Sequence, residues 1–188
     1  MSVRLVRLDG DDSDDAEMLP AHCETAKLLA RLVEIDDACF PRDAGGIASA
    51  RAWASSRRLR RAARLAAAYE DAEPAVSGGD GDAASRARPK RVVAFASFVA
   101  SSMCFEITKV ACDPAARRRG HARRAVAAIL AEARRRNAPR VALRVEKANA
   151  AAAALYASLG FREDASRARA HEDYYGAGRN GAVFEYLT

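Results

Sequence analysis

The most informative part of the sequence is centred on Arg117-Arg118-Arg119-Gly120-His121-Ala122, between a strand-like segment at Phe105–Cys112 and a second one at Val141–Glu146. After Gly120, apolar side chains recur at the spacing of an amphipathic helix that reaches about Asn137. The predicted apolar face holds Ala122, Ala125, Val126, Ile129, Leu130 and Ala133, and the polar face holds Arg123, Arg124, Glu132, Arg134 and Arg135. A short alanine-rich helix that carries Tyr156 follows the second strand, and Asn149 stands where the cap of this helix is expected.

The start of the predicted helix has the features of an anion-binding site. The first amide groups of a helix lack internal hydrogen-bond partners, and the helix dipole makes this end electropositive. Gly120 has no Cβ, so the backbone can approach a phosphate closely, and the preceding arginines add positive charge. The sequence therefore predicts a site for a ligand that carries a diphosphate. The alternative is a basic helix start that is only solvated.

Two motifs in this stretch resemble those of one enzyme superfamily. Residues 117–122 resemble the acetyl-CoA diphosphate loop of the GNAT N-acetyltransferases, Arg/Gln-x-x-Gly-x-Gly/Ala, in the Arg-Arg-x-Gly-x-Ala form common in protein N-terminal acetyltransferases. Residues 149–161 resemble the family's Asn-x-x-Ala-x-x-Leu-Tyr-x-x-x-Gly-Phe element. The resemblance is firm over residues 92–161, weaker over 162–188 and faint before residue 92. It implies an α/β (α+β) GNAT fold, in which helices flank a mixed, mostly antiparallel, twisted sheet.

The resemblance also implies acetyl-CoA as co-substrate, and no metal. The residues that it assigns to acetyl-CoA are Val110 and Cys112 (through their backbone), Arg117, Arg118, Arg119, Gly120, His121, Ala122, Asn149 and Tyr156. Tyr156 is the first catalytic candidate, because the family's tyrosine at this position reaches the sulfur of CoA. A phenol with a pKa of about 10 is a weak acid toward a thiolate of about 8.5, so a hydrogen bond to the departing sulfur is at least as good a role as proton transfer. The alternative role is that of an aromatic core residue.

Glu106 is the second catalytic candidate, as a general base. An acceptor ammonium must lose a proton before it attacks, and Glu106 precedes the loop glycine by fourteen residues, a spacing that resembles the base of histone-type GNAT enzymes. Strand alternation places Glu106, Thr108 and Val110 on one face. Arg144 stands where the N-terminal acetyltransferases often carry a Glu or His, so Glu146 is a further candidate. The alternative for Glu106 is a structural ion pair with an arginine.

Three aromatic side chains are candidates for the acceptor site. A Phe-Pro step such as the one at residues 40–41 helps line the acceptor pocket in the N-terminal acetyltransferases, and residues 174–181 resemble their Tyr-Tyr-x-x-Gly-Glu-Asp-Ala hairpin. Phe40, Tyr174 and Tyr175 are therefore expected to contact the acceptor. Arg179 and Asn180 replace the acidic pair of that hairpin, which reverses its charge. The alternatives are a phenylalanine that covers the edge of the core and a glycine-rich hairpin with surface tyrosines.

The rest of the chain fits one domain over residues 1–188, with a flexible insertion over about 71–90 that is rich in Gly, Ser, Ala, Asp and Pro. The further predicted elements are a strand at Val3–Leu8, a helix at Thr25–Cys39 with Thr25 as its cap, a helix at Ala48–Arg60 with Trp53 buried, a strand at Leu65–Tyr69, a hairpin of Val92–Val99 and Met103–Cys112 that turns at Ser101-Ser102, and a closing strand at Ala182–Leu187.

The composition of the chain indicates which classes of ligand and partner it can bind. The net charge of +6 and the pI of about 9.4 favour anionic ligands. A basic cluster indicates either a solvated face or contact with nucleic acid or an acidic peptide, and its members are Arg57, Arg58, Arg60, Arg61 and Arg64. No apolar run approaches the ~20 residues of a membrane span. The cysteines lack CxxC spacing, which is typical of a reduced protein in the cytoplasm, or alternatively the nucleus, and the scattered histidines indicate no metal site.

We therefore expect an N-acetyltransferase that moves an acetyl group from acetyl-CoA to a primary amine by direct attack. The expected acceptor is a protein N-terminal α-amine, such as that of a ribosomal protein. Neither a metal nor an acyl-enzyme is required, although Cys112 leaves a covalent route open. The first alternative is a lysine or a small-molecule amine as acceptor. The second is a basic module that binds nucleic acid or the ribosome without catalysis.

Overall fold

The computed structural model describes residues 2–7, 21–40, 49–56, 64–71, 90–166 and 172–188. Its strands are β1 (Ser2–Arg7), β2 (Arg64–Asp71), β3 (Lys90–Ala100), β4 (Phe105–Cys112), β5 (Arg140–Glu146), β6 (Arg162–Glu163) and β7 (Gly181–Leu187). Its helices are α1 (Ala21–Cys39), α2 (Ala50–Ser55), the 3-10 helix η1 (Pro114–Ala116), α4 (His121–Arg135) and α5 (Ala150–Ala157). The strands form one sheet in the order β1-β2-β3-β4-β5-β7-β6, antiparallel except for the pair β4–β5, which confirms the predicted fold class.

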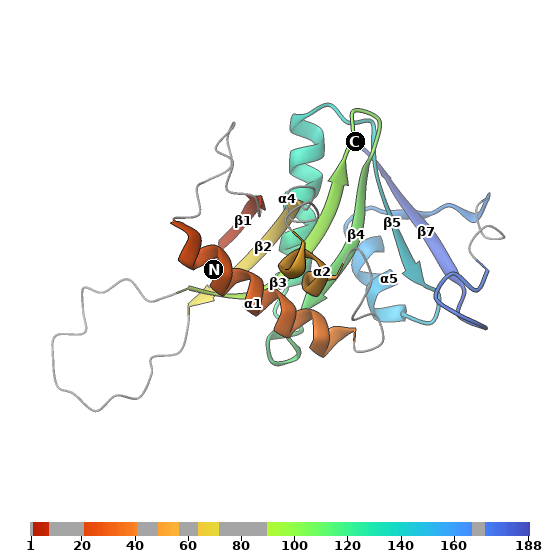
Figure 1. Cartoon of the computed structure of the whole chain (residues 1–188). Coiled ribbons are helices and arrows are strands. Elements are labelled where there is room, and N and C mark those ends of the chain that lie inside the picture. Colours follow the sequence, from red (N-terminus) through yellow and green to blue (C-terminus); the bar gives the residue numbers. More distant parts are fainter. Residues whose placement is uncertain (1, 8–20, 41–48, 57–63, 72–89, 167–171) are drawn as a thin grey trace, which may run out of the picture.

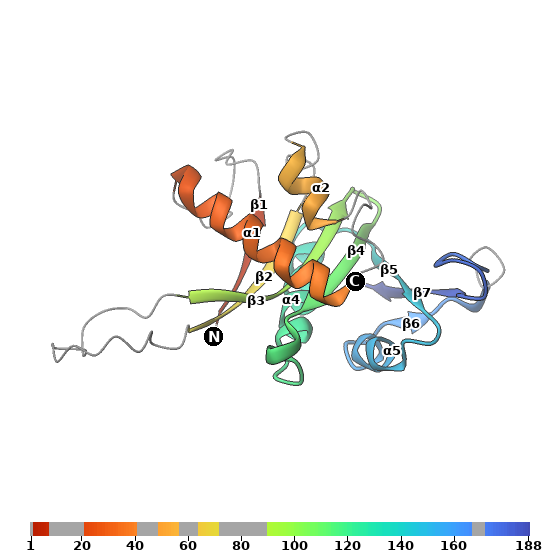
Figure 2. The same cartoon turned by 60° about the horizontal axis from the view of Figure 1, so that its bottom comes forward.

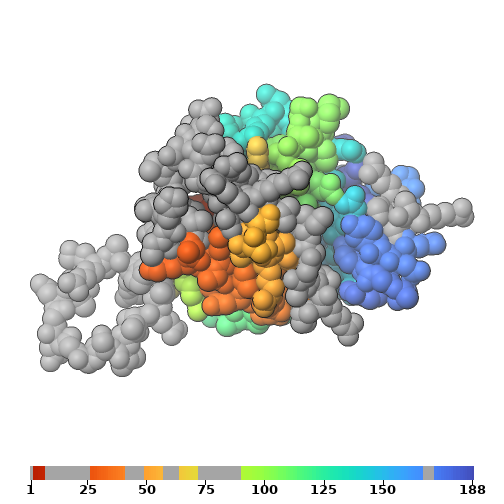
Figure 3. Space-filling model, viewed as in Figure 1, coloured from red at the N-terminus to blue at the C-terminus, as the bar shows by residue number. Residues whose placement is uncertain are grey.

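Helices cover both faces of the sheet (Figure 1, Figure 2). α1 and α2 lie on one face, over its β2–β4 half, and α4 and α5 lie on the other face. Figure 3 shows α1 and α2 as adjoining surfaces on the first face. Each face has its own buried cluster: Leu32 and Trp53 pack with Phe95 beneath α1 and α2, whereas Ile129 and Leu143 belong to the cluster beneath α4. Trp53 is buried, as predicted.

The helix predicted after the loop glycine forms as α4, and its apolar stripe packs against the sheet. Val126 and Ile129 are completely buried. Glu132, which was expected on the polar face, is only 6% exposed, so that assignment is wrong. The guanidinium groups of Arg135 and Arg136 fold over its carboxylate and pair with it, and this pairing offsets the cost of burying a charge.

β4 contains a β-bulge. Ser97 of β3 pairs with Lys109, and Phe98 pairs with Ile107, so Thr108 is an extra residue on β4. An extra residue shifts the alternation of side chains by one position. As a result, Lys109 turns toward α1 and α2, on the face opposite to that of Ile107.

The bulge overturns one prediction about the catalytic face. Phe105 and Ile107 both pack into the cluster beneath α4, so Glu106 between them faces the opposite side of the sheet. Beyond the bulge, Val110 contacts the same cluster as Ile107. Glu106 and Val110 therefore lie on opposite faces. The prediction that they share a face with Thr108 is wrong, because simple alternation takes no account of a bulge.

β4 and β5 diverge along their length. They pair in register only at Phe105–Val141, Glu106–Ala142 and Ile107–Leu143, although β4 continues to Cys112 and β5 to Glu146. Beyond Ile107 and Leu143 the two strands are thus splayed apart. β4 leads from this opening directly into η1 and the loop at residues 117–122.

The remaining predicted elements form with shifted bounds. The β3–β4 hairpin turns at Ser101–Cys104, where the Ser101 hydroxyl accepts the Cys104 N–H at 3.0 Å. Thr25 is not the cap of α1, because the helix already begins at Ala21. Except for its end residues Asp71 and Lys90, which belong to β2 and β3, the insertion predicted over 71–90 lies outside the described residues, as does most of the arginine cluster over 57–64. Within the described ranges, no helix is long and apolar enough to cross a membrane.

Candidate active site

The loop between η1 and α4 forms a cradle around Gly120. This residue directly precedes α4 and has φ = +80°, in the left-handed region that favours glycine. A Cβ at this position would meet only the end of the Arg124 side chain, at 3.5 Å. The first turn of α4 has amide groups without helical partners. The open side of Gly120, next to these amides, fits the diphosphate of a CoA molecule.

The three loop arginines present positive charge around this cradle. Arg117, Arg118 and Arg119 are all exposed. Arg117 donates from Nε to the Cys112 carbonyl at 3.4 Å. Arg119 Nη1 lies 3.4 Å from Oε2 of Glu70, at the end of β2. The loop is therefore anchored to β4 and to β2, while its guanidinium groups remain accessible.

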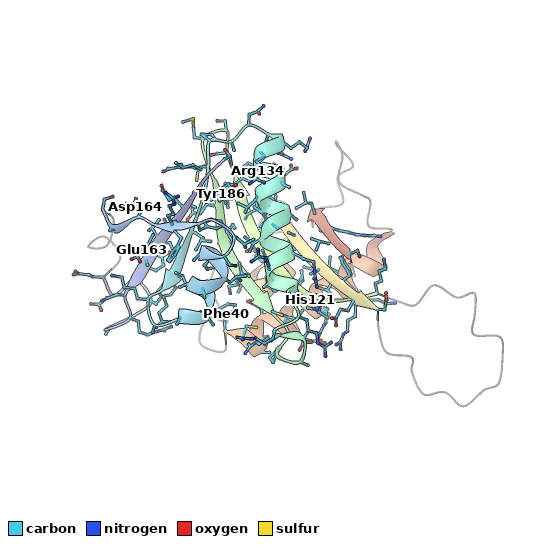
Figure 4. The ribbon with its side chains drawn as sticks, turned by 180° about the vertical axis from the view of Figure 1, so that it is seen from behind. Phe40, His121, Arg134, Glu163, Asp164 and Tyr186 are labelled. Carbon is cyan, nitrogen blue, oxygen red and sulfur yellow. The ribbon has the colours of Figure 1, made fainter. Side chains whose placement is uncertain are left out.

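His121 lies differently from its neighbours in the loop. Its imidazole is fully buried, and Nε2 lies 2.5 Å from Oε1 of Glu70. Figure 4 shows His121 at the start of α4, whereas Arg134 and Tyr186 lie near the other end of this helix. The family resemblance predicted His121 in the cofactor site. Because the imidazole is inside the protein, only the backbone of His121 can face a ligand.

Asp113 connects η1, at the start of the loop at residues 117–122, to α1. Its Oδ1 accepts the Ala115 N–H at 2.9 Å and so caps η1, while Oδ2 pairs with the guanidinium of Arg31 in α1. Arg31 Nε also donates to the Val92 carbonyl at 3.1 Å, which ties α1 to β3. Burial raises the pKa of Asp113, but the hydrogen bonds from Ala115 and Arg31 outweigh burial, so the pKa is lowered overall.

Asp113→Asn is expected to destabilise the fold by about 1–2 kcal/mol at neutral pH, or about 2–8 °C in Tm. A lowered carboxyl pKa contributes stability above the unfolded-state pKa of 3.8, and this stability is lost as the pH falls through the folded-state pKa. The Tm difference between wild type and variant, measured by calorimetry, should be constant above about pH 6 and shrink below about pH 4. Asp37→Asn, which breaks an exposed pair with Arg51, should lower Tm less. A Tm difference independent of pH would contradict this role of the Asp113 charge.

Tyr156 lies in an aromatic cluster between α5 and the sheet. It is 6% exposed, and its ring centroid lies 5.9 Å from that of Phe161 and 6.3 Å from that of Phe184. Burial raises the pKa of the Tyr156 phenol, and the charge of nearby Tyr175 raises it further. The phenol therefore stays protonated at neutral pH. It can donate a hydrogen bond, but it is a poor source of a proton.

The other predicted cofactor residues flank the opening between β4 and β5. Val110 and Cys112 lie on β4 beyond its last pairing with β5, and Asn149 follows the end of β5. Asn149 Oδ1 accepts the Ala152 N–H at 3.1 Å, which confirms it as the cap of α5. Ala122 lies in the first turn of α4, next to the cradle. The topology thus brings these positions to one end of the sheet.

Two glutamate–arginine pairs lie beside the tyrosines of the 172–180 loop. Arg144 Nη1 bonds to Glu106 Oε1, and the guanidinium lies 5.5 Å from the ring centroid of Tyr174. Arg179 donates to both carboxylate oxygens of Glu146, each at 2.8 Å. Burial lowers the pKa of Arg144, but the hydrogen bond and charge of Glu106 outweigh burial, so the pKa is raised overall. The structural ion pair considered for Glu106 is present, and its role as a base stays a prediction.

Phe40 follows the end of α1, next to a buried ion pair that the sequence did not indicate. Lys109 Nζ lies 4.6 Å from the ring centroid of Phe40 and 3.0 Å from Asp36 Oδ1. Asp36 Oδ2 accepts the Ala50 N–H at 2.9 Å, so this carboxylate also holds the start of α2. The contact of Phe40 with an acceptor stays a prediction. Among the described residues, no group of three or more His, Cys, Asp or Glu side chains could hold a metal ion.

The sequence and the fold both match known acetyltransferases. The sequence profile of the Acetyltransferase (GNAT) family matches residues 30–161, which is more than half of the chain. The chain therefore belongs to the GNAT family, and it is an acetyl-CoA-dependent N-acetyltransferase. No curated protein sequence matches it significantly.

Solved structures share the fold at low sequence identity. The ribosomal-protein-S18-alanine N-acetyltransferase from Escherichia coli is 18% identical, with a TM-score of 0.60 over 99% of this chain and 94% of that chain. A chain of the NatC complex bound to Gag peptide and CoA is 15% identical, with a TM-score of 0.59 over 100% and 99%. The yncA protein of Salmonella typhimurium, solved with acetyl-CoA, is 18% identical, with a TM-score of 0.56 over 86% and 89%. At these identities the likeness shows the fold alone.

Proposed function

We propose that the protein transfers the acetyl group of acetyl-CoA to the α-amine of a protein N-terminus. Residues 117–122 would hold the diphosphate of acetyl-CoA, the backbone of Val110 and Cys112 together with Asn149 would hold the pantetheine arm, and Tyr156 would donate a hydrogen bond to the sulfur. Acetyl-CoA supplies an acetyl group activated as a thioester. The left-handed Gly120 at the start of α4, beyond the opening between β4 and β5, supports this donor site.

Direct attack by the amine is favoured over a covalent enzyme intermediate. Cys112 is the cysteine of the predicted donor site. Burial and the charge of nearby Cys39 raise the pKa of the Cys112 thiol to about 11. A thiol with this pKa is protonated at neutral pH and is a poor nucleophile. Cys112 therefore does not supply the activated nucleophile that an acyl-enzyme intermediate would require.

The single observation that carries the choice of acceptor is that arginines engage both candidate bases. Glu106 is bonded by Arg144, and Glu146 is bonded on both oxygens by Arg179. An amine must be neutral to attack, and each of these carboxylates already accepts a hydrogen bond from an arginine. An α-amine has a pKa of about 8 and a lysine about 10.4, so at pH 8 about half of the α-amine but under about 1% of the lysine is neutral. The site therefore favours an α-amine.

Two of the structures that share the fold agree with this choice. One is named as an enzyme for the alanine of a ribosomal protein, and the other is a complex solved with a peptide and CoA. Tyr174 and Tyr175, on the exposed 172–180 loop beside Glu106 and Arg144, would contact the acceptor chain. Phe40 would contact it from the end of α1.

A competition between two peptides tests the acceptor class. One peptide has a free N-terminus and no lysine, and the other has a blocked N-terminus and one lysine. The ratio of kcat/KM, α-amine over lysine, is expected to be about 100 at pH 7.5 and to fall as the pH approaches 10, because the two pKa values differ by about 2.4 units. A faster lysine peptide, or a ratio that does not change with pH, would favour a lysine or small-amine acceptor. If neither peptide is acetylated and the protein binds RNA in a salt-sensitive manner, the result would favour a non-catalytic module.

A further inference from the structure

A network of four side chains links the diphosphate loop (residues 117–122) to strand β2. Arg124 Nη2 lies 3.1 Å from Nδ1 of His121, and His121 Nε2 lies 2.5 Å from Oε1 of Glu70. The other carboxylate oxygen of Glu70 pairs with Arg119 at 3.4 Å. Both arginines belong to the segment that surrounds Gly120. Glu70, from the distant strand β2, is the acidic member of this network.

The chemistry of the donors fixes the direction of each hydrogen bond. A guanidinium can only donate, so Nδ1 of His121 accepts from Arg124. The imidazole proton then resides on Nε2, which donates to Glu70. The imidazole is fully buried, so no solvent-exposed face of His121 competes for these hydrogen bonds. By accepting the Nε2–H, Glu70 thus selects the tautomer of His121 whose unprotonated Nδ1 can accept a hydrogen bond from Arg124.

Arg124 in turn supports the backbone of the loop. The same Nη2 donates to the Arg119 carbonyl at 3.1 Å, and Nη1 lies 3.5 Å from the place of a Cβ on Gly120. We propose that Glu70 is a positioning residue for acetyl-CoA: through His121 it holds Arg124 under Gly120 and so fixes the loop that receives the diphosphate. This inference rests on the donor half of the proposed function, and it is independent of the acceptor.

If Glu70 acted on CoA only through its charge, its removal would change the affinity in the direction opposite to that expected for a positioning residue. Glu70 is a carboxylate near a site for an anion, so its removal alone should strengthen the binding of CoA through reduced repulsion. Loss of a positioning residue should weaken binding instead. The sign of the change on Glu70→Ala therefore separates the two roles.

The test measures the Kd of CoA by calorimetry for the wild type and three variants of Glu70. Glu70→Ala is expected to raise Kd about tenfold, with the KM for acetyl-CoA following Kd and kcat at saturation unchanged. Glu70→Gln keeps an acceptor for the His121 Nε2–H, so its Kd should stay within about threefold of wild type. Glu70→Asp keeps the charge but is one methylene shorter, so it should also weaken binding, and it decides the question if the alanine variant does not fold.

Glu132→Ala is the matched control. Glu132 is also a carboxylate with two basic partners, Arg135 and Arg136, and it is more deeply buried than Glu70, but it lies near the far end of α4. It should lower Tm while leaving the Kd of CoA unchanged. Equal or tighter binding by Glu70→Ala would overturn the inference, and so would an equal loss of binding in Glu132→Ala. A wild type that does not bind CoA would instead contradict the proposed donor site.

Discussion

Gly120→Glu is expected to abolish the binding of acetyl-CoA, raising its Kd at least about 100-fold, or about 2.7 kcal/mol. The new carboxylate would stand where the backbone is open to the diphosphate, and it would attract the guanidinium of Arg124, only 3.5 Å from the new Cβ. Charge repulsion and a filled cradle act in the same direction. Thermal unfolding with and without millimolar acetyl-CoA measures the effect, because a ligand that binds only the folded state raises Tm.

Gly178→Glu is the control for backbone strain. Gly178 has φ = +73°, close to that of Gly120, and a Cβ there would meet no atom within 4 Å. Any side chain at either position costs about 1–2 kcal/mol of stability through the left-handed conformation. Only the Gly120 variant should lose the ligand-dependent rise in Tm. If it keeps that rise, the loop is a basic helix start and not the diphosphate site.

Tyr156→Phe is expected to lower kcat about 100-fold while the Kd of acetyl-CoA stays unchanged. The variant loses a hydrogen-bond donor to the sulfur, on which negative charge develops as the thioester breaks. The ring keeps its contacts with Phe161 and Phe184, so Tm should change little. The pKa of the phenol is raised above its ordinary value of 10.0, so Tyr156 stays protonated from about pH 7 to about pH 9. The ratio of kcat between the wild type and Tyr156→Phe should therefore be constant over this range.

Tyr186→Phe is the matched control for the loss of a hydroxyl. Tyr186 also packs on Phe161, at 5.7 Å between ring centroids, but its hydroxyl bonds to Arg134 near the far end of α4 (Figure 4). Loss of the Tyr186 hydroxyl should therefore change Tm more than it changes kcat. A Tyr156→Phe enzyme with the turnover of wild type would exclude the phenol from catalysis and leave it the role of a core residue.

The parts of the fold that the sequence predicted depend on local patterns. The spacing of apolar residues predicted α4, the position of Gly120 predicted its start, and Asn149 was predicted as the cap of α5. These features follow from hydrogen bonds and side-chain positions within a few residues of each other. The family resemblance of the two motifs then predicted the class of the sheet, which the structure confirms.

The features that sequence analysis missed depend on residues far apart in the chain. The bulge at Thr108 turns Lys109 toward Asp36, and no local pattern marks a bulge. Glu70 had no predicted role, because the predicted strand ended at Tyr69, yet Glu70 meets His121 across the fold. Pairings of this kind require the register of the strands, which single-sequence periodicity does not supply.

The preference for arginine around the site has a consequence for the enzyme itself. The sequence contains four lysines, at positions 27, 90, 109 and 147, among 31 basic residues. An arginine is always protonated and offers no nucleophilic amine, so the guanidinium groups of the donor loop and of the acceptor side cannot be acetylated. Lys109, the one lysine of β4, is buried in an ion pair with Asp36. An enzyme that handles activated acetyl groups thus offers few lysines of its own for acetylation, and the exposed Lys147, two residues before Asn149, is one of them.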